Sequence, residues 1–146
     1  MNVNARKYWD EFWQGTKQPE SMDAWQFGYK PDELAKLVVD GIKTATTSGY
    51  IFYELEKASL PMIDHYSIIL NSQDNPVAII RIVDVQIIPM NEVSVEHALA
   101  EGEGDYQSWK EGHEVFFKNE LLEIGREFCE DMLVVCEKFE LVDVKG

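Results

Sequence analysis

Residues 41–47 (Gly-Ile-Lys-Thr-Ala-Thr-Thr) place a lysine and several hydroxyl groups close together along the chain. In a turn-like segment, the ammonium of Lys43 and the hydroxyl of Thr46 lie near each other. A partly desolvated lysine can act as a base, and a neighbouring threonine hydroxyl is a candidate nucleophile. The segment is not a phosphate-binding P-loop, because Leu37 stands where that pattern begins with glycine. The alternative is a helix end with a solvated lysine, followed by threonines that begin a strand.

Residues 101–105 (Glu-Gly-Glu-Gly-Asp) bring three carboxylates together, separated by glycines. Glycine allows a positive φ, so such a loop can aim one carboxylate into a pocket. Crowding by like charges raises the pKa of a carboxyl group towards the range of a general acid. The alternative is a flexible acidic connector in which Asp105 caps the next helix. A divalent-cation site is a weaker third interpretation, because the carboxylates lack the spacing of an EF-hand loop.

Trp109 and His113 are four residues apart, so they share one face of a predicted helix. An aromatic ring beside an imidazole can stack on a nucleobase, or the pair can form the edge of a core. The other histidines, His65 and His97, are isolated along the chain. No metal-ligand motif and no Ser-His-Asp signature is present.

Arg81 is a lone charge in an otherwise apolar predicted strand. An unpaired charge inside a protein is costly, so Arg81 must reach solvent or pair with a carboxylate. The sequence leaves open whether that partner belongs to the acidic loop, where Arg81 would help to position it.

Helices and strands must hold these groups in place. Helices are predicted over residues 4–14, with an aromatic face that favours core packing, and from Pro31 to a stop at Gly41. Ser94 and Asp105 are expected to cap two further helices, the second with Trp109, Val115 or Phe116, and Phe117 facing inwards. Residues 15–22 are expected to form a loop.

Runs rich in branched residues predict strands at residues 66–70, 77–88 and 132–142. Turn residues 71–76 separate the first two, which predicts a hairpin, and a bulge near Val83 would reconcile its irregular alternation. We therefore expect an α+β domain, a small, mostly antiparallel β-barrel with several short helices over its openings. Residues 1–146 are expected to form one domain, with residues 1–21 as an N-terminal helical extension.

The 146 residues are 45% hydrophobic, enough for an ordinary core, and carry a net charge of −14. Such an acidic surface repels phosphate backbones, so we expect no DNA partner and no general coating of nucleic acid. No apolar stretch is long enough to span a membrane, and the charged start predicts no secretory signal. Free thiols are expected at Cys129 and Cys136, and the protein is expected in the cytoplasm.

The motifs occur in an informative order. Residues 25–28 (Trp-Gln-Phe-Gly), 41–46, 79–82 (Ile-Ile-Arg-Ile) and 101–105 are followed by Trp109, His113 and Phe116-Phe117. This order resembles the ASCH domain family, and more specifically its longer bacterial members, over residues 22–143. The resemblance implies a barrel related to the PUA domain, a fold often used for RNA, with a cleft as the functional site.

The resemblance also implies an activity, because some smaller ASCH members remove the acyl group from N4-acetylcytidine with a lysine, a threonine and a glutamate. By motif these match Lys43, Thr46 and Glu103, although Glu101 is close enough to be the true equivalent. Either Thr46 attacks the amide with Lys43 as base, or a water molecule attacks it with the assistance of Lys43 and Glu103.

Substrate contacts are expected from six further residues: Thr44, Arg81, Glu101, Asp105, Trp109 and His113. No metal and no cofactor is expected. The expected partner is a nucleoside or nucleotide, with two alternatives in the same cleft: a non-catalytic domain that binds a nucleotide or single-stranded RNA, and a ribonuclease. The oligomeric state is left open, including a dimer through the N-terminal helix.

Overall fold

The computed structural model describes residues 1–146 and contains one five-stranded sheet with strand order β1-β3-β4-β5-β2. The strands are β1 (Met22–Trp25), β2 (Ala45–Gly49), β3 (Tyr66–Leu70), β4 (Pro76–Pro89) and β5 (Leu133–Val144). The β1–β3 pair is parallel and the other pairs are antiparallel. The expected α+β fold with a mostly antiparallel, PUA-like sheet is confirmed, and β1 and β2 are the two edges of that sheet.

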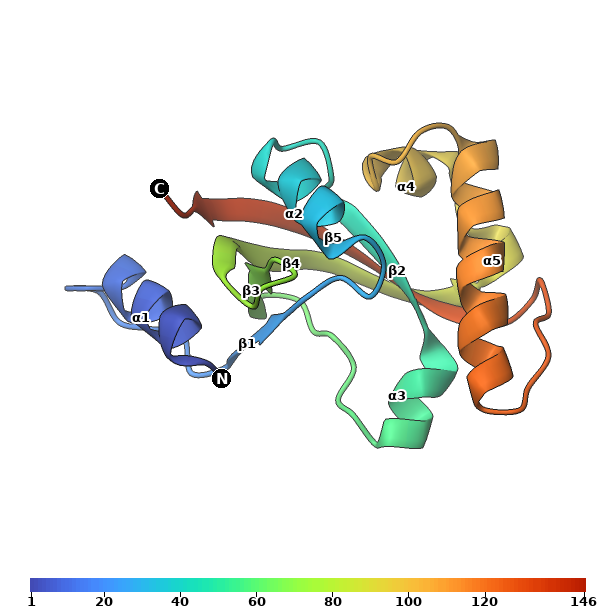
Figure 1. Cartoon of the computed structure of the whole chain (residues 1–146), viewed down its shortest axis with the longest axis horizontal. Helices are drawn as coiled ribbons and strands as arrows, with labels where there is room; N and C mark the ends of the chain where they lie inside the picture. The colour runs from blue at the N-terminus through green and yellow to red at the C-terminus, as the bar shows by residue number, and fades with distance from the viewer.

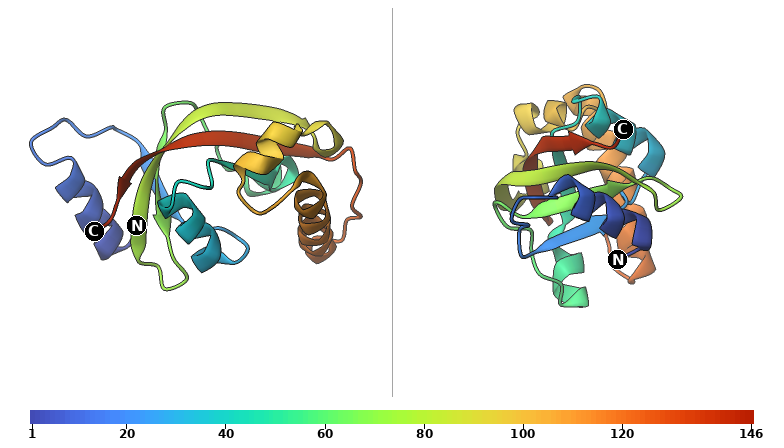
Figure 2. Two further views of the ribbon diagram at one scale, coloured as in Figure 1. Left: turned by 90° about the horizontal axis from the view of Figure 1, so that it is seen from above. Right: turned by 90° about the vertical axis from the view of Figure 1, so that its left-hand side faces the viewer.

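The helices are distributed from one end to the other of the two longest strands, β4 and β5 (Figure 1). They are α1 (Val3–Phe12), α2 (Pro31–Val39), α3 (Tyr50–Glu56), α4 (Val95–Ala100) and α5 (Tyr106–Glu123), with a 3₁₀ turn at Met90–Glu92. The β4–β5 pair forms an arch, and α1, α2 and α5 follow one another along the same side of it (Figure 2, left). The functional groups of the loops next to α2 and α5 therefore meet on that side.

The predicted hairpin and its bulge are both present. β3 pairs with β4 from Tyr66–Arg81 to Leu70–Pro76, and the β4–β5 register shifts between Ile82 and Asp84. The extra residue at this shift is Val83, so the irregular alternation of the sequence does mark a bulge. The hairpin turn is closed by the Asn71 side chain, which accepts hydrogen bonds from the backbone of Gln73 and Asn75.

The predicted helix ends are also confirmed. The Ser94 hydroxyl accepts a hydrogen bond from the backbone of His97, and the Asp105 carboxylate accepts one from Ser108. Of the two alternatives for the inner face of α5, Phe116 is partly buried, whereas Val115 is exposed.

Two apolar clusters hold α2 and α5 against the sheet. Leu34, Ala35 and Val38 of α2 pack with Ile80 and Phe139. Towards the other end of the arch, three buried residues of α4 and α5 pack with two of β5: Ala98, Trp109, Phe117, Val134 and Cys136. Because both helices rest on the same two strands, the space between them has a defined shape.

The sequence analysis did not predict β1 or α3, and β2 appeared only in its alternative interpretation of residues 41–47. β1 has only four residues, too few to show alternation, and it gains its hydrogen bonds from β3, a strand far along the chain. α3 begins with four consecutive aromatic or aliphatic residues, 50–53, so its sequence shows no helical periodicity.

Both cysteines are free, Cys129 exposed and Cys136 buried, as the sequence predicted. None of the helices combines the length and the apolar character needed to cross a bilayer.

The aromatic face of α1 is part of the core, as expected. Tyr8 and Trp9 pack with Ile68 and Ile79 of the sheet. The Tyr8 hydroxyl donates a hydrogen bond of 2.8 Å to the Asp143 carboxylate at the end of β5. This contact joins the two ends of the chain and closes one end of the sheet.

We expect Trp9→Ala to lower the free energy of unfolding by about 3–5 kcal/mol, because it removes a large, fully buried ring that packs α1 against the sheet. Chemical denaturation measures the change. Val3→Ala on the same helix is the control, since Val3 is exposed and its loss should be nearly neutral. Equal stabilities of the two variants would mean that the packing of α1 on the sheet does not stabilise the fold.

Candidate functional site

A cavity of about 540 Å³ lies between α2, the acidic loop and α5. Phe27, Tyr29 and Phe116 supply aromatic walls. The polar groups of the cavity include five that the sequence had singled out: Lys43, Thr46, Glu101, Glu103 and His113. This volume and this mixture of aromatic walls with a few polar groups are typical of small-molecule sites.

Glu101 is a buried carboxylate with partners on both oxygens. Its Oε2 accepts a hydrogen bond of 2.7 Å from the Thr47 hydroxyl and another from the Trp109 indole. Its Oε1 lies 3.3 Å from Nζ of Lys43, which is also buried. The expected alternative of a solvated lysine is therefore wrong, because the chain buries Lys43 in an ion pair.

Two histidines complete the surroundings of Glu101. The Thr47 hydroxyl donates to Glu101, so it accepts at 2.9 Å from Nε2 of His97. Nδ1 of His113 donates to the Trp109 carbonyl at 2.8 Å, which leaves Nε2 of His113 facing Glu101 Oε1 at 3.5 Å. His113 also stacks on Trp109 with ring centroids 4.5 Å apart.

These contacts set the charge state of the cluster. Burial alone would raise the pKa of the Glu101 carboxyl, but the two histidines and Lys43 outweigh it and hold that pKa well below its ordinary value. Burial acts to lower the pKa of His97, yet the neighbouring Cys136 and Glu101 raise it to about 9. The pKa of His113 is raised by Glu101 against the effect of its burial. Glu101 is thus a permanent anion among cationic groups.

The end of α2 positions Lys43. Gly41 has φ +74°, and the backbone N–H groups of Gly41 and Ile42 donate to the carbonyls of Val38 and Leu37. This is a Schellman motif, which needs glycine at that position. The backbone N–H of Lys43 also donates to the Leu37 carbonyl, and that of Thr44 donates to the Ala100 carbonyl at 2.8 Å, so the segment is tied to the end of α4 beside Glu101.

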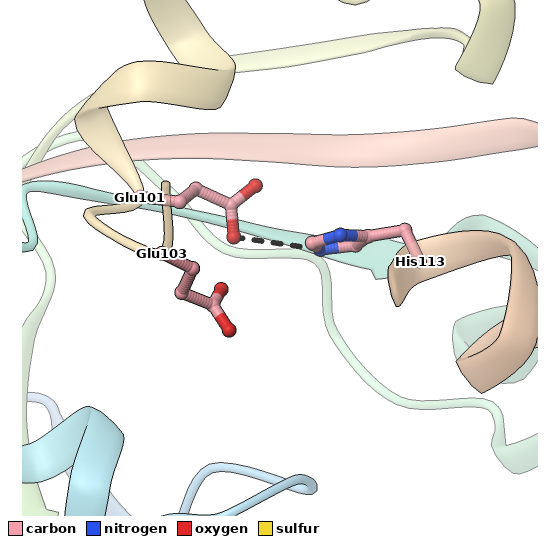
Figure 3. A group of neighbouring side chains, drawn as sticks. All are labelled: Glu101, Glu103 and His113. Atoms are coloured by element: carbon pink, nitrogen blue, oxygen red, sulfur yellow. Dashed lines mark ion pairs between the residues drawn. The ribbon is translucent and has the colours of Figure 1, made fainter. Parts of the chain in front are cut away.

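Gly102 separates the two glutamates of the acidic loop. Its φ is +78°, and an added Cβ would lie 2.9 Å from a side-chain carbon of Ile42. The resulting turn leaves Glu101 pointing towards His113 of α5, while Glu103 extends from the loop into the open part of the site (Figure 3). The Glu103 carboxylate is partly exposed and lies 3.9 Å from Nζ of Lys43.

Glu101, Glu103 and His113 also bring ligand atoms within 4.8 Å of one another, close enough to hold a metal ion. Lys43 lies within 4 Å of both carboxylates and already supplies a cation there. A divalent ion among these atoms would be repelled by the ammonium. The absence of a metal from the chemistry therefore stays a prediction, and this geometry favours it.

Three predicted contact residues lie outside the cavity lining. The Thr44 hydroxyl donates to the Ala100 carbonyl at 3.4 Å, and Asp105 caps α5. Arg81 pairs with Asp64 and Glu140, so the carboxylates that pair with it, which the sequence left open, do not belong to the acidic loop. The bulge in β4 and the pairing with β5 place Arg81 beside Glu140, far along the chain from residues 101–105.

Two residues of the cluster escaped the sequence analysis: Thr47 and His97. His97 was set aside as isolated, yet it lies one helical turn before Glu101 on α4, with Nε2 3.5 Å from Glu101 Oε2. That i, i+4 spacing was readable in the sequence. The partnership with Thr47 was not, because it joins α4 to β2 across 50 positions.

Glu137 of β5 is a second buried carboxyl group. It lies opposite Thr46 in the β2–β5 pair, and opposite residues of antiparallel strands share one face of a sheet. Burial raises the pKa of Glu137 to about 7, with Asp23 adding to the increase and Lys43 opposing it. Glu137 therefore holds a proton across much of the acidic range.

A model of one protein family, described as the ASCH domain, matches residues 23–143. A crystal structure of protein EF3133 from Enterococcus faecalis V583, described under DUF984, has a TM-score of 0.89 and 41% identity over 99% of this chain and 91% of that one. An ASCH domain from Lactobacillus crispatus JV V101 has a TM-score of 0.90 and 30% identity over 97% and 95%. No curated protein matches the chain significantly.

We expect Lys43→Met and Glu101→Gln each to lower the free energy of unfolding at pH 7, by about 3–5 kcal/mol for Lys43→Met, because breaking a buried ion pair leaves an uncompensated group. The double variant removes both charges, so its loss should be smaller than the sum of the single losses by about 1–3 kcal/mol. Urea denaturation of all four proteins gives this coupling. Strictly additive losses would contradict the buried pair.

Glu137 predicts a pH-dependent stability. Its folded pKa exceeds its unfolded value, so the folded state binds the extra proton, and stability falls as pH rises from about 4.5 to about 7. Across that range, the free energy of unfolding of Glu137→Gln should rise relative to that of the wild type by up to about 3 kcal/mol. Denaturation curves at several pH values measure the gain. The exposed Glu127→Gln should follow the wild type, and a Glu137→Gln curve parallel to both would refute the raised pKa.

Proposed function

This chain belongs to the ASCH domain family, and we propose that it hydrolyses the amide on the exocyclic nitrogen of an N4-acylated cytidine-type nucleoside. One observation carries the proposal: Lys43, Thr46 and Glu103 line the same cavity, with Lys43 Nζ 3.9 Å from Glu103 Oε2. A cation, a hydroxyl and a carboxylate that is open to the cavity are a sufficient set for amide hydrolysis without a metal.

The two glutamates take different roles because their surroundings differ. Glu101 is buried, fully hydrogen-bonded and held as an anion, so it orients Lys43 and exchanges no proton. Glu103 is partly exposed and its carboxylate is free of hydrogen bonds to other side chains. Glu103 is therefore the group that can take a proton and return it.

The same geometry favours an attacking water over an attack by Thr46. Lys43 lies between two carboxylates and carries a positive charge, so it is poorly suited to take a proton from a hydroxyl. Glu103 takes a proton from water as the water oxygen attacks the amide carbon. The Lys43 ammonium stabilises the resulting oxyanion, and Thr46 holds the substrate. The C–N bond then breaks, Glu103 returns its proton to the leaving nitrogen, and the products are a carboxylic acid and the free nucleoside.

The mouth of the cavity favours a ligand without a long phosphate chain. Two lysines line it, and each is paired with a carboxylate of α2: Lys30 with Glu33 at 3.8 Å, and Lys36 with Asp40 at 2.9 Å. These pairs leave little positive charge for phosphates in a protein of net charge −14. A nucleoside suits this mouth better than single-stranded RNA, the alternative ligand of the same cleft.

We expect the wild type to hydrolyse N4-acetylcytidine and Glu103→Gln to lower kcat by about 10²–10⁴-fold, the usual contribution of a general acid–base group. Ultraviolet absorbance follows the reaction. Glu103 is partly exposed, so the variant should keep the wild-type Tm. The matched control is Glu33→Gln, which also removes a carboxylate from the cavity wall but should keep its rate.

Two outcomes would contradict the proposal. One is a folded wild type that hydrolyses no N4-acylated nucleoside, and the other is a Glu103→Gln variant with the wild-type rate. In the first case, binding of a short RNA that weakens steeply with salt would support the RNA-binding alternative.

A further inference from the structure

Gly112 occupies the middle of α5, where a glycine destabilises a helix relative to alanine. Its backbone does not require glycine, since its φ is not positive. Packing does not require it either, because an added Cβ would meet no atom within 4 Å. Gly112 nevertheless lines the cavity. Gly112 is exposed, so the missing side chain leaves open space where the cavity wall meets solvent.

Two other glycines near the site have local reasons to be glycine. Gly41 and Gly102 have positive φ, and a Cβ on Gly102 would collide with Ile42. A Cβ on Gly28 would make an ordinary contact with the Phe116 ring at 3.5 Å, so that position holds no empty space. Gly112 differs from Gly41 and Gly102 because no turn and no close approach requires it, and from Gly28 because open space lies beside it.

The open space lies next to the groups that would carry out the reaction. Gly112 directly precedes His113, whose Nε2 is 3.5 Å from Glu101 Oε1, and that oxygen is 3.3 Å from Lys43 Nζ. Phe116, one helical turn after Gly112, borders the same cavity with its ring, whereas Trp109, one turn before, is 2% exposed. The space therefore shares the cavity with the ion pair and has the Phe116 ring on one side.

We propose that Gly112 makes room for the acyl group of the substrate and so sets which acyl chains the enzyme accepts. This inference rests on the proposed amide hydrolysis. The bond to be broken must lie within reach of Lys43 and Glu103, and the acyl group is attached directly to that bond. An aliphatic acyl chain suits a space beside an aromatic ring, while the polar ribose points to the mouth of the cavity. Acyl groups longer than acetyl should fit.

The test compares hydrolysis of N4-acetyl-, N4-butyryl- and N4-hexanoylcytidine by the wild type, Gly112→Ala and Gly112→Leu. Gly112→Ala should raise the Tm by about 2 °C through its better helix propensity. It should nevertheless lower kcat/KM for the longer chains by about 10-fold or more, and for acetyl by much less. Gly112→Leu should extend the loss to the acetyl substrate. Stability and activity thus move in opposite directions, which a structural role for Gly112 would not produce.

Asn119→Ala is the matched control, because it also improves the helix propensity of α5 at an exposed position outside the cavity. It should raise the Tm and leave the acyl preference unchanged. If Gly112→Ala raises the Tm and all three substrates keep their relative kcat/KM, the role of Gly112 is refuted and the proposed hydrolysis stands. If the wild type hydrolyses none of the three, the proposed function fails, and this inference fails with it.

Discussion

The burial of one carboxylate, that of Glu101, constrains the whole functional half of the protein. An isolated charge in a protein interior costs several kcal/mol, so its partners must all be in place when the chain folds. These partners come from separate elements: Lys43 before β2, Thr47 in β2, His97 in α4, and Trp109 and His113 in α5. The Glu101 carboxylate thereby fixes how α4 and α5 meet the edge strand β2.

That constraint explains how two glutamates two positions apart acquire different chemistry. Gly102 turns the chain between them, so that Glu101 enters the interior and Glu103 faces the cavity. The interior surrounds the first with donors and makes it a permanent anion, while the second forms an ion pair only with Lys43, at 3.9 Å. Lys43 is held by the first and presented to the second. In the proposed reaction, positioning and proton transfer are therefore divided between two residues of one loop.

Much of the fold could be predicted because its determinants are local. Branched residues with turn chemistry between them indicate the β3–β4 hairpin, broken alternation indicates the bulge at Val83, and Ser94 and Asp105 begin the helices they were expected to cap. The elements that escaped prediction, β1 and α3, have no such local signal. β1 is a strand only because β3 pairs with it, and α3 opens with an unbroken run of aromatic and aliphatic residues that has no helical periodicity.

The same division applies to the candidate site. The sequence alone determined which residues are candidates: the types and order of Lys43, Thr46, Glu103, Trp109 and His113 follow one family's pattern, and all five line one cavity. It could not determine that Lys43 is buried, that His97 takes part, or that Arg81 pairs with Asp64 and Glu140. Those outcomes depend on which distant strands become neighbours. Since the free energy of a charged side chain is set by its surroundings, only the tertiary structure decided them.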